Sequence, residues 1–443
     1  MMRSMFSGVS GLRAHQTRMD VIGNNVANVN TVGFKSGRVT FQEIFSQTLR
    51  GAGAPDSATG RGGTNPMQVG LGLGVGAVDT IMTRGSLQRT DNPTDVSIEG
   101  EGFFVMKGGT GDTFRFSRAG NFTIDKSGNL VTGSGMNVYG WQQLATGKKD
   151  EFDTEQKIEA INLYSDKYRN KRIIPAQVST KAVLAGNLDA AYMDLATATA
   201  APISDPTLAK KFTVPMTVYD SLGQSYKISL DFQKASVAAG PPPTTTWNIT
   251  SGGGTVQGLA TVVFDGNGAL TPASAAEIRA LRITPTAATS GTASFDVNLD
   301  LTKLTMYSAD CSVKPISIDG YTMGTLVTFN IGSDGILTGI YDNGQQQALG
   351  MLALANFQNP AGLQKVGDNM YIPTTNSGEF DEKGVKAGSE GVGTFNPGTL
   401  EMSNVDLSKE FTEMIITQRG FQANSRIITT SDEMLQELVN LKR

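Results

Sequence analysis

The distribution of proline is the feature that most constrains this chain. All 16 prolines lie between Pro55 and Pro397, so residues 1–54 and 398–443 lack the residue that most disfavours helix interiors. Between these ends, short apolar runs alternate with polar turns that contain glycine, which is typical of strands and hairpins. The sequence therefore predicts a mainly β protein with α-helical termini.

Apolar residues at both ends recur at spacings of three and four, as on one face of a helix. The N-terminal stripe consists of Met5, Val9, Leu12, Gln16, Met19 and Val26. The C-terminal stripe consists of Leu407, Phe411, Met414, Gln418, Phe421, Ile428, Leu435 and Leu438. Asp406 or Ser403 is the expected N-cap of the second helix, which only Gly420 interrupts.

These stripes need packing partners, because a lone amphipathic helix of this length is marginal in water. Residues 1–50 carry six basic and two acidic side chains, and residues 401–443 carry five basic and seven acidic ones. The stripes either close a domain within one chain as a coiled pair or meet the stripes of other copies, and periodicity leaves both open. In the second case the ends are disordered in the isolated subunit. Assembly then buries Leu12, Met19, Val26, Phe411, Met414, Ile415 and Leu435.

A short sequence pattern recurs in the middle of the chain: an alternating apolar run, a polar turn with glycine, and a further apolar residue. It occurs at residues 122–130, 262–270 and 329–337, and more weakly at 218–224. The pattern predicts β-hairpins. Their aspartates are expected to cap the turns, because the segments lack the ladder of oxygen ligands of a calcium loop.

Two stretches rich in alanine, threonine, glycine and proline, residues 191–211 and 234–258, predict exposed loops, and Thr245 serves as an example of an exposed residue there. Residues 51–76 are rich in glycine. Within them, residues 69–75 alternate strictly, which predicts a strand that a neighbouring backbone approaches closely.

Composition excludes several function classes. The net charge of −4 argues against nucleic acid as a partner, and no apolar run is long enough for a membrane span. One cysteine and one histidine allow no disulfide within the chain and no usual zinc site. His15 is expected at the surface or in an interface, and Cys311 in a strand as a small buried residue. The sequence predicts no catalytic, metal-binding or cofactor-binding residues.

Three stretches are more specific than hydrophobic periodicity or composition, and they resemble the axial proteins of the bacterial flagellar rod and hook. The first is residues 7–12 with 24–35, the second is residues 400–410 with 418–424, and the third is residues 99–105 with 118–122. The residues that carry the terminal motifs are Asn24, Asn25, Ala27, Asn28, Asn30, Thr31, Gly33, Phe34, Ser403, Asn404, Val405 and Asp406. The hook branch of the family is the nearer likeness, because residues of about 164–316 form a large insert that rod relatives lack.

The resemblance implies an architecture of nested domains, each built from discontinuous pieces. Residues 1–35 with 401–443 form a helical, coiled-coil-like terminal domain, and 36–90 with 375–400 form a Gly-rich connecting segment. Residues 91–163 with 317–374 form an inner β-domain, and residues 164–316 form an outer inserted β-domain.

The resemblance also implies a function. Many copies polymerise into a curved, flexible, hollow tube that transmits torque from the rotary motor to the filament, outside the cell body. The implied partners are other copies, the rod, hook-cap and hook–filament junction proteins, and the flagellar type III export apparatus. That route suits an N-terminus in which residues 1–30 lack the apolar region of a secretory signal. The alternatives are a rigid distal-rod-type subunit, a secreted β-rich adhesin or an unrecognised hydrolase.

Some spirochaete members of the family carry a covalent Cys–Lys cross-link between subunits. The position expected for that cysteine is occupied here by Gly186 or Ala185, and Cys311 lies elsewhere. The resemblance therefore does not extend to the cross-link.

Overall fold

A computed structural model describes most of the 443-residue chain. The described residues are 2–55, 60, 62–108, 113–145, 151–165, 167, 171–192, 211–238, 243–252, 256–257, 260–272, 274, 279–284, 292–389 and 391–441. The expected loop at residues 191–211 falls almost entirely outside them.

The chain divides into two compact units. The first comprises Met1–Arg169, Phe329–Gly339 and Gln347–Arg443, and the second comprises Asn170–Thr328 and Ile340–Gln346. Along the chain, the boundary falls within strand β23 (Gly324–Ile331) and near the end of β24 (Ile336–Tyr341).

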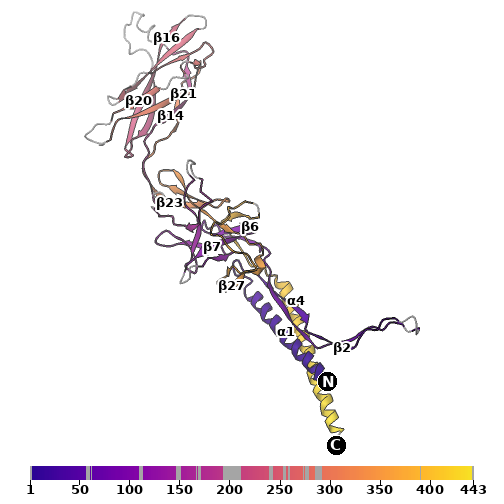
Figure 1. Cartoon of the computed structure of the whole chain (residues 1–443). Helices are drawn as coiled ribbons and strands as arrows, with labels where there is room; N and C mark the ends of the chain where they lie inside the picture. Colours follow the sequence, from indigo (N-terminus) through magenta and orange to yellow (C-terminus); the bar gives the residue numbers. More distant parts are fainter. Residues whose placement is uncertain are drawn as a thin grey trace, which may run out of the picture. The chain divides into compact units, whose positions relative to one another are not determined.

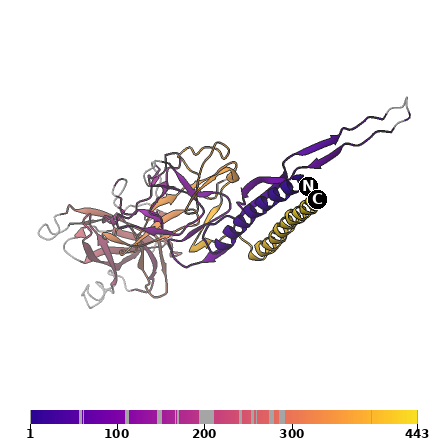
Figure 2. The same cartoon turned by 90° about the horizontal axis from the view of Figure 1, so that it is seen from below.

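Both ends of the chain are helical, as the absence of proline predicts. Helix α1 spans Met2–Ala27 and helix α4 spans Leu407–Asn440, and they lie side by side in both views (Figures 1 and 2). Asp406 is the N-cap of α4, because its Oδ1 accepts hydrogen bonds from the amides of Ser408 (2.9 Å) and Lys409 (3.3 Å). The prediction of that cap is confirmed.

Two antiparallel ribbons follow α1. Strand β1 (Gly37–Glu43) pairs with β4 (Leu73–Thr80), and β2 (Ser46–Arg50) pairs with β3 (Met67–Gly70). The alternating segment 69–75 is thus two strands rather than one, interrupted at Gly72. This glycine has a φ of +125°, and a Cβ there would lie 2.3 Å from Ser10 Oγ of α1. The expected close approach of a neighbouring segment is present at this residue.

The core of the first unit is built from short antiparallel strands. The strand order is β25-β11-β7-β8-β28-β27, with β10 and β12 on β11 and β26 on β7. These strands are β7 (Phe103–Lys107), β8 (Arg115–Ser117), β9 (Phe122–Ile124), β10 (Leu130–Thr132), β11 (Asn137–Trp141), β12 (Glu159–Ala160), β25 (Gln346–Leu352), β26 (Leu354–Ala355), β27 (Gln364–Gly367) and β28 (Met370–Ile372). A short 3₁₀ turn, η2 (Pro360–Gly362), precedes β27.

Aromatic side chains fill this core. Phe116 contacts Phe357 edge to face at 4.8 Å between ring centroids, and Phe103 contacts Tyr371 in the same way at 5.9 Å. Two small ladders extend the unit toward the helices: β6 (Val96–Glu99) pairs with β29 (Thr394–Pro397), and β5 (Leu87–Arg89) pairs with β30 (Thr399–Glu401). Segments from both ends of the chain therefore lie against the same core.

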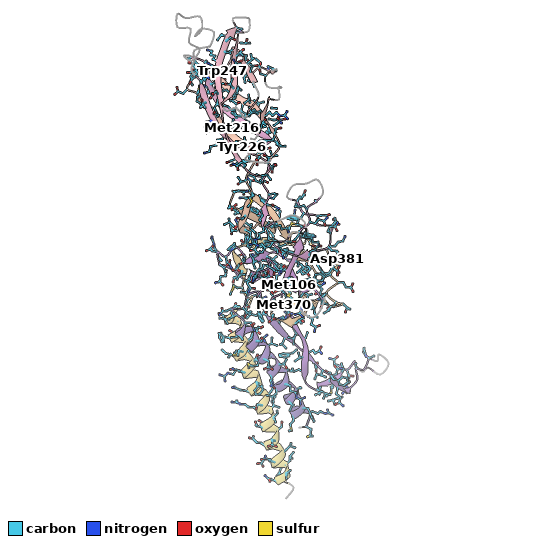
Figure 3. All side chains as sticks on the ribbon, turned by 90° about the vertical axis from the view of Figure 1, so that its left-hand side faces the viewer. Met106, Met216, Tyr226, Trp247, Met370 and Asp381 are labelled. Atoms are coloured by element: carbon cyan, nitrogen blue, oxygen red, sulfur yellow. The ribbon has the colours of Figure 1, made fainter. Side chains whose placement is uncertain are left out.

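The second unit packs two sheets over its own core. One sheet has the order β18-β20-β21-β14-β22, in which β14 and β21 are parallel, and the other has the order β15-β16-β17-β19. Their strands are β14 (Lys181–Asp189), β15 (Phe212–Tyr219), β16 (Ser225–Ala238), β17 (Thr244–Gly252), β18 (Val256–Gln257), β19 (Ala260–Phe264), β20 (Arg279–Ile283), β21 (Phe295–Tyr307) and β22 (Lys314–Ile318). The short strand β13 (Ile173–Ile174) pairs with β23. Trp247, which Figure 3 labels with Met216 and Tyr226, is fully buried in the core.

The predicted hairpin turns are confirmed, and aspartates cap them. Asp125 Oδ1 accepts a hydrogen bond from the amide of Asn129 at 2.7 Å, and Asp220 Oδ1 accepts one from the amide of Gln224 at 2.9 Å. Asp265 accepts the equivalent bond from the amide of Ala269 at 2.8 Å, and Asp334 accepts one from the amide of Ile336, two residues on, at 3.1 Å. These short bonds to the charged carboxylate stabilise turns that glycine alone would leave mobile.

Two sequence-based expectations in the second unit are wrong. Residues 234–258 are not mainly loop, because β16 and β17 run through them, and Thr245 is buried where its strand faces the core. The alternation of threonine with Trp247 and Ile249 is typical of a strand, but the preceding prolines made the segment resemble a loop. Cys311 lies in the loop between β21 and β22 and is half-buried, with its Sγ 3.2 Å from the amide nitrogen of Asp189.

We expect residues 175–321 to fold alone. All the buried residues of their core lie between Ala182 and Val313, and Gln177 and Tyr321 join the two ends through backbone hydrogen bonds of 3.0 and 3.1 Å. Trp247 is the only tryptophan of the fragment, so its fluorescence reports the core directly. The isolated fragment should melt in one cooperative transition, and a gradual loss of signal without a transition would contradict its independence.

Candidate assembly site: the terminal helix pair and its anchor

Helices α1 and α4 pack antiparallel within one chain. Ser4 near the start of α1 contacts Ser431 at 3.4 Å between hydroxyl oxygens, and Arg18 further along forms an ion pair with Glu413 at 3.1 Å. At the far end of α1, Asn25 donates a hydrogen bond to Glu410 at 3.1 Å. Each helix thus finds a partner in its own chain. Of the two alternatives that the sequence left open, a coiled pair within one chain therefore describes how α1 and α4 pair.

The seam between the helices consists mainly of small and polar side chains, with Ile427 and Ile428 of α4 packed against Gly8 of α1. The buried residues are Gly8, Gly11, Ala14, Ile22 and Asn25 on α1 and Glu410, Thr417 and Ser431 on α4. Gly420 sits against His15, and a Cβ at this glycine would lie 2.7 Å from His15 Cε1. Gly420 therefore allows the helices to approach closely, and His15 takes the interface position expected of it.

Most residues of the apolar stripes predicted from the sequence lie outside this seam, although Ile428 packs against Gly8 within it. Val9, Leu407, Phe411, Ile415, Phe421 and Leu438 are exposed, and Met5, Leu12, Met19, Val26, Met414, Ile428 and Leu435 are half-buried. A sequence signal for the true seam existed in Gly8 and Gly11, because glycines allow two helix backbones to approach more closely than larger residues do. The assembly role of the stripes stays a prediction.

Two titratable groups lie in the seam. Burial raises the pKa of Glu410, while the hydrogen bond from Asn25 opposes that rise and the nearby Glu413 adds to it. Burial also lowers the pKa of His15, and the positive charge of Arg18 acts in the same direction. Both groups are thereby shifted toward their neutral forms.

Asparagines at the end of α1 and the start of α4 fix how the helix pair joins the strands. Asn25 accepts from the amide of Gly37 at 2.9 Å and donates to its carbonyl at 2.8 Å. Asn404 accepts from the amide of Ser36 at 2.8 Å and donates to the carbonyls of Ile81 (2.9 Å) and Thr83 (3.1 Å). The side-chain amide suits this role because it donates and accepts at once.

The other motif residues shape the loop after α1. Asn28 donates to the carbonyl of Asn24 at 2.9 Å and accepts from Thr31 Oγ1 at 3.1 Å, so the helix ends in a closed turn. Gly33 then donates from its amide to the carbonyl of Glu401 at 2.8 Å. Phe34 is buried, and so is Ser403, whereas Val405 is half-buried and Ala27 and Asn30 are exposed. Most of the motif therefore serves contacts within the chain.

A buried ion cluster anchors this junction. Glu401 is fully buried, and its carboxylate lies 2.6 Å from Lys35 Nζ and 3.4 Å from an Arg118 guanidinium nitrogen. Lys35 also donates to the carbonyl of Thr83 at 2.9 Å, and Arg118 donates to that of Gly100 at 2.8 Å. One carboxylate thus holds together the segment after α1, the segment before α4 and the inner strands.

Burial is the main cause of the lowered pKa of both Lys35 and Arg118, and the charge of Glu401 opposes it in each case. Glu101 reaches Arg118 from the surface at 3.6 Å. Burial also raises the pKa of Tyr371 to about 12. Sequence reasoning did not single out Lys35, Arg118 or Glu401 as partners, because no periodicity links positions so far apart.

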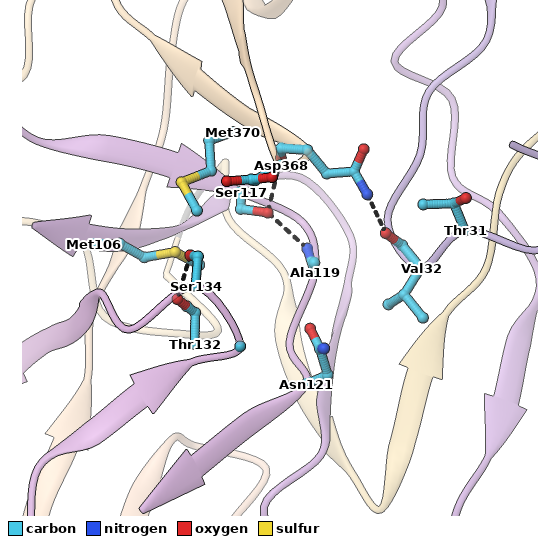
Figure 4. Close-up of a pocket in the computed structure, with 12 residues that line it drawn as sticks. Thr31, Val32, Met106, Ser117, Ala119, Asn121, Thr132, Ser134, Asp368 and Met370 are labelled. Atoms are coloured by element: carbon cyan, nitrogen blue, oxygen red, sulfur yellow. Dashed lines mark hydrogen bonds between the residues drawn. The ribbon is translucent and has the colours of Figure 1, made fainter. Parts of the chain in front are cut away.

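A hollow of about 580 Å³, lined by both polar and apolar residues, lies beside the junction (Figure 4). Asn369 donates to the carbonyl of Val32 at 2.9 Å, and Ser117 donates to the carbonyl of Asn369 at 2.9 Å. Its side chains thus bond to backbone, and no group of acidic, histidine or cysteine side chains in the described residues could hold a metal ion. Among the described residues, no helix is long and apolar enough to cross a membrane.

Comparison with protein-family models finds four matches along the chain. Residues 5–35 match "Flagella basal body rod protein", and residues 396–441 match "Flagellar basal body rod FlgEFG protein C-terminal". Residues 97–171 match "Flagellar hook protein FlgE/F/G D1 domain", and residues 187–321 match "Flagellar basal body protein FlaE D2 domain". The two terminal matches cover nearly all of the helix pair together with Lys35 and Glu401 of the anchor, and Arg118 falls within the D1 match.

Full-length relatives decide the family. The chain is 41% identical to the flagellar hook protein FlgE of Treponema pallidum over 481 residues and 40% identical to that of Borreliella burgdorferi over 463 residues, with both chains covered completely. The chain belongs to the flagellar hook protein family. The basal-body rod protein FlgG of Bacillus subtilis is 31% identical over 443 residues, also with complete coverage of both chains.

The chain is thus a structural subunit of the bacterial flagellar hook, outside the cell body. The hook proteins of Treponema pallidum and Borreliella burgdorferi are more similar to it than the rod protein of Bacillus subtilis, so a distal-rod subunit is not favoured, and neither is an adhesin. A solved structure of the Helicobacter pylori flagellar hook protein FlgE2 covers 71% of this chain and 100% of its own, with a TM-score of 0.46 and 13% identity.

We expect Glu401→Gln to destabilise the helix pair by about 3–5 kcal/mol, because it removes the buried counter-charge of Lys35 and leaves Arg118 with only the surface carboxylate of Glu101. The measurement is denaturant unfolding followed by helical circular dichroism, since both long helices lie at the junction. Glu99→Gln is the matched control, because its ion pair with Arg84 is exposed and should contribute less than about 1 kcal/mol. Equal effects of the two substitutions would contradict the anchoring role.

Glu410 should make the stability of the helix pair depend on pH. Its pKa is raised in the folded chain, so it contributes stability at low pH that is lost as pH rises through that raised value. Glu410→Gln, which stays neutral, should therefore gain in melting temperature relative to the unchanged chain as pH rises above the ordinary glutamate value of 4.5. A melting difference that stays constant with pH would contradict this assignment, and the exposed Glu433→Gln supplies the control.

Proposed function

We propose that this subunit assembles through the outer surfaces of its terminal helix pair into the curved, hollow, flexible tube of the hook. In that tube the helices form a tight inner core, and the outer β-domains make weaker contacts with neighbours. The assembled tube transmits torque from the rotary motor to the filament while it bends.

The observation that carries this proposal is the exposure of large apolar side chains on helices that already have a partner. Phe6 of α1 is 66% exposed, and Phe411 and Ile415 of α4 are 50% and 59% exposed. Soluble monomers seldom leave such groups in contiguous surfaces, whereas protein–protein interfaces bury them. The stripes found in the sequence therefore suit contacts between copies, and the small residues of the seam suit contacts within a copy.

The composition of the chain favours contacts between neighbouring subunits that can slide past one another. Charged residues make up 18% of the sequence, against about 25% in a typical soluble domain. Fixed ion pairs between neighbouring subunits would resist the length changes that a rotating bent tube demands of each strand of subunits. A surface rich in threonine, alanine and glycine instead offers many weak contacts that exchange easily.

We also propose the domain layout and the remaining partners on the strength of family membership. The layout has terminal, connecting, inner and outer domains, with the outer domain at residues of about 164–316. The partners are the rod, hook-cap and hook–filament junction proteins and the flagellar type III export apparatus.

Phe411→Ala and Ile415→Ala should raise the critical concentration for assembly while the subunit melts as before. Each removes an apolar side chain from a contact between copies, which costs on the order of 2–5 kcal/mol where that side chain becomes fully buried. Ser425→Ala, an exposed change on the same helix, should alter neither quantity by more than about 0.5 kcal/mol.

Electron microscopy of the unchanged protein after nucleated assembly tests the shape. Curved tubes support the proposal, and straight tubes or stable monomers contradict it. A lower melting temperature of the Phe411→Ala subunit with unchanged assembly would instead mean that this side chain stabilises only its own chain.

A further inference from the structure

Helix α4 extends past the start of α1. The contact between Ser4 and Ser431 lies close to Met2, where α1 begins, yet α4 continues to Asn440 (Figure 1). The residues from 432 to 441 are called the overhang here. Among the described residues of α1, only Met2 and Arg3 lie beyond Ser4, so α1 has no described residue opposite most of the overhang.

The side chains of α4 change in character where α1 ends. The face that packs on α1 carries Gly420, Asn424 and Ser431, and the same three-four spacing continues into the overhang with Leu435 and Leu438. Leu438 is 50% exposed, and Met434 beside it is 47% exposed. Where α1 lies opposite, the seam is mainly small and polar, although Ile427 and Ile428 also reach Gly8, and in the overhang the same face becomes apolar.

A groove of about 470 Å³ runs along a different face of α1. Phe6, Val9 and Arg13 line it from the helix, and Ile44 and Val75 line it from the ribbon of β1 and β4. These α1 residues are offset by well over a quarter turn from Gly8, Gly11 and His15, which face α4. The groove is thus open while the seam is closed.

The overhang and the groove carry opposite charges. Residues 432–441 include Asp432, Glu433 and Glu437 and no basic side chain, while Arg13 is the only charged side chain that lines the groove. Within the described part of the chain, no ion pair involves Arg13, Glu433 or Glu437. Lys442 and Arg443 follow outside the described residues.

We propose that the overhang of one subunit docks in the α1 groove of a second copy of the same chain, with its acidic side chains next to Arg13. The proposal rests on the proposed assembly through the helix pair and names one of its contacts. A chain cannot fill its own groove in this way, because its overhang continues α4 away from the paired length of α1.

The geometry of this contact allows assembly to continue from one subunit to the next. The overhang and the groove are different surfaces, so each subunit offers one of each to two different neighbours. Such head-to-tail contacts build rings or open helical assemblies and not closed dimers. The groove contact therefore supplies a reason why assembly continues beyond two copies.

Paired cysteines test the contact directly. In a full-length chain with Cys311→Ser, the substitutions Leu438→Cys and Ile44→Cys place one thiol on the overhang and one beside the groove. Oxidation of the assembled protein should give a ladder of covalent multimers on a denaturing gel, because every copy links to the next. The control pair Thr412→Cys with Ile44→Cys, which keeps an exposed α4 position but lies outside the overhang, should give no ladder.

Charge reversal provides the second measurement. Arg13→Glu alone and Glu433→Lys with Glu437→Lys should each raise the critical concentration for assembly roughly 3- to 10-fold, as exposed ion pairs allow. The chain that carries all three reversals should return close to the unchanged value, since attraction is restored.

The outcomes separate this inference from the proposed function. Tubes that form normally but give no ladder, or no recovery in the triple variant, overturn the groove contact and leave assembly through the helix pair standing. A ladder that stops at dimers overturns the head-to-tail geometry. Failure of the unchanged protein to assemble at all overturns both proposals.

Discussion

The carboxylate of Glu401 is the contact on which the rest of the first unit depends. It lies between Lys35 and Arg118, far from water, and each of these three side chains belongs to a different stretch of the sequence. A buried carboxylate with two cations and several backbone partners defines one geometry, since a shifted arrangement would leave a charge unpaired at high cost. The helix pair is therefore attached to the strands at a fixed position by electrostatics, and the asparagines Asn25 and Asn404 reinforce that position.

The terminal helices divide their surfaces between two tasks. Small and polar residues such as Gly11 and Thr417 face the partner helix of the same chain, and large apolar residues such as Phe411 face outward. In most helix pairs the apolar stripe closes the pair itself. Here close backbone approach and a few hydrogen bonds hold the pair, which leaves the apolar surface available to other copies of a hook subunit.

The sequence predicted the helical ends, the N-cap at Asp406 and the glycine hairpins, because each depends on local chemistry over a few residues. The sequence also indicated the protein family, through the motifs around Asn25 and Asn404, whose side chains make specific contacts. It did not reveal the seam, since an apolar stripe is a stronger signal than the small-residue spacing at Gly8 and Gly11. It placed Thr245 wrongly because prolines and threonines resemble a loop when strand pairing cannot be seen.

The anchor has a consequence for the order of folding. The contact between Lys35 and Glu401 closes a loop of 366 residues, so it cannot form until nearly the whole chain is available. A chain that stops before residue 401 lacks both the carboxylate that Lys35 and Arg118 share and the partner helix of α1. The junction thereby acts as a check on completeness: only an intact polypeptide can present both halves of the helix pair to a growing polymer.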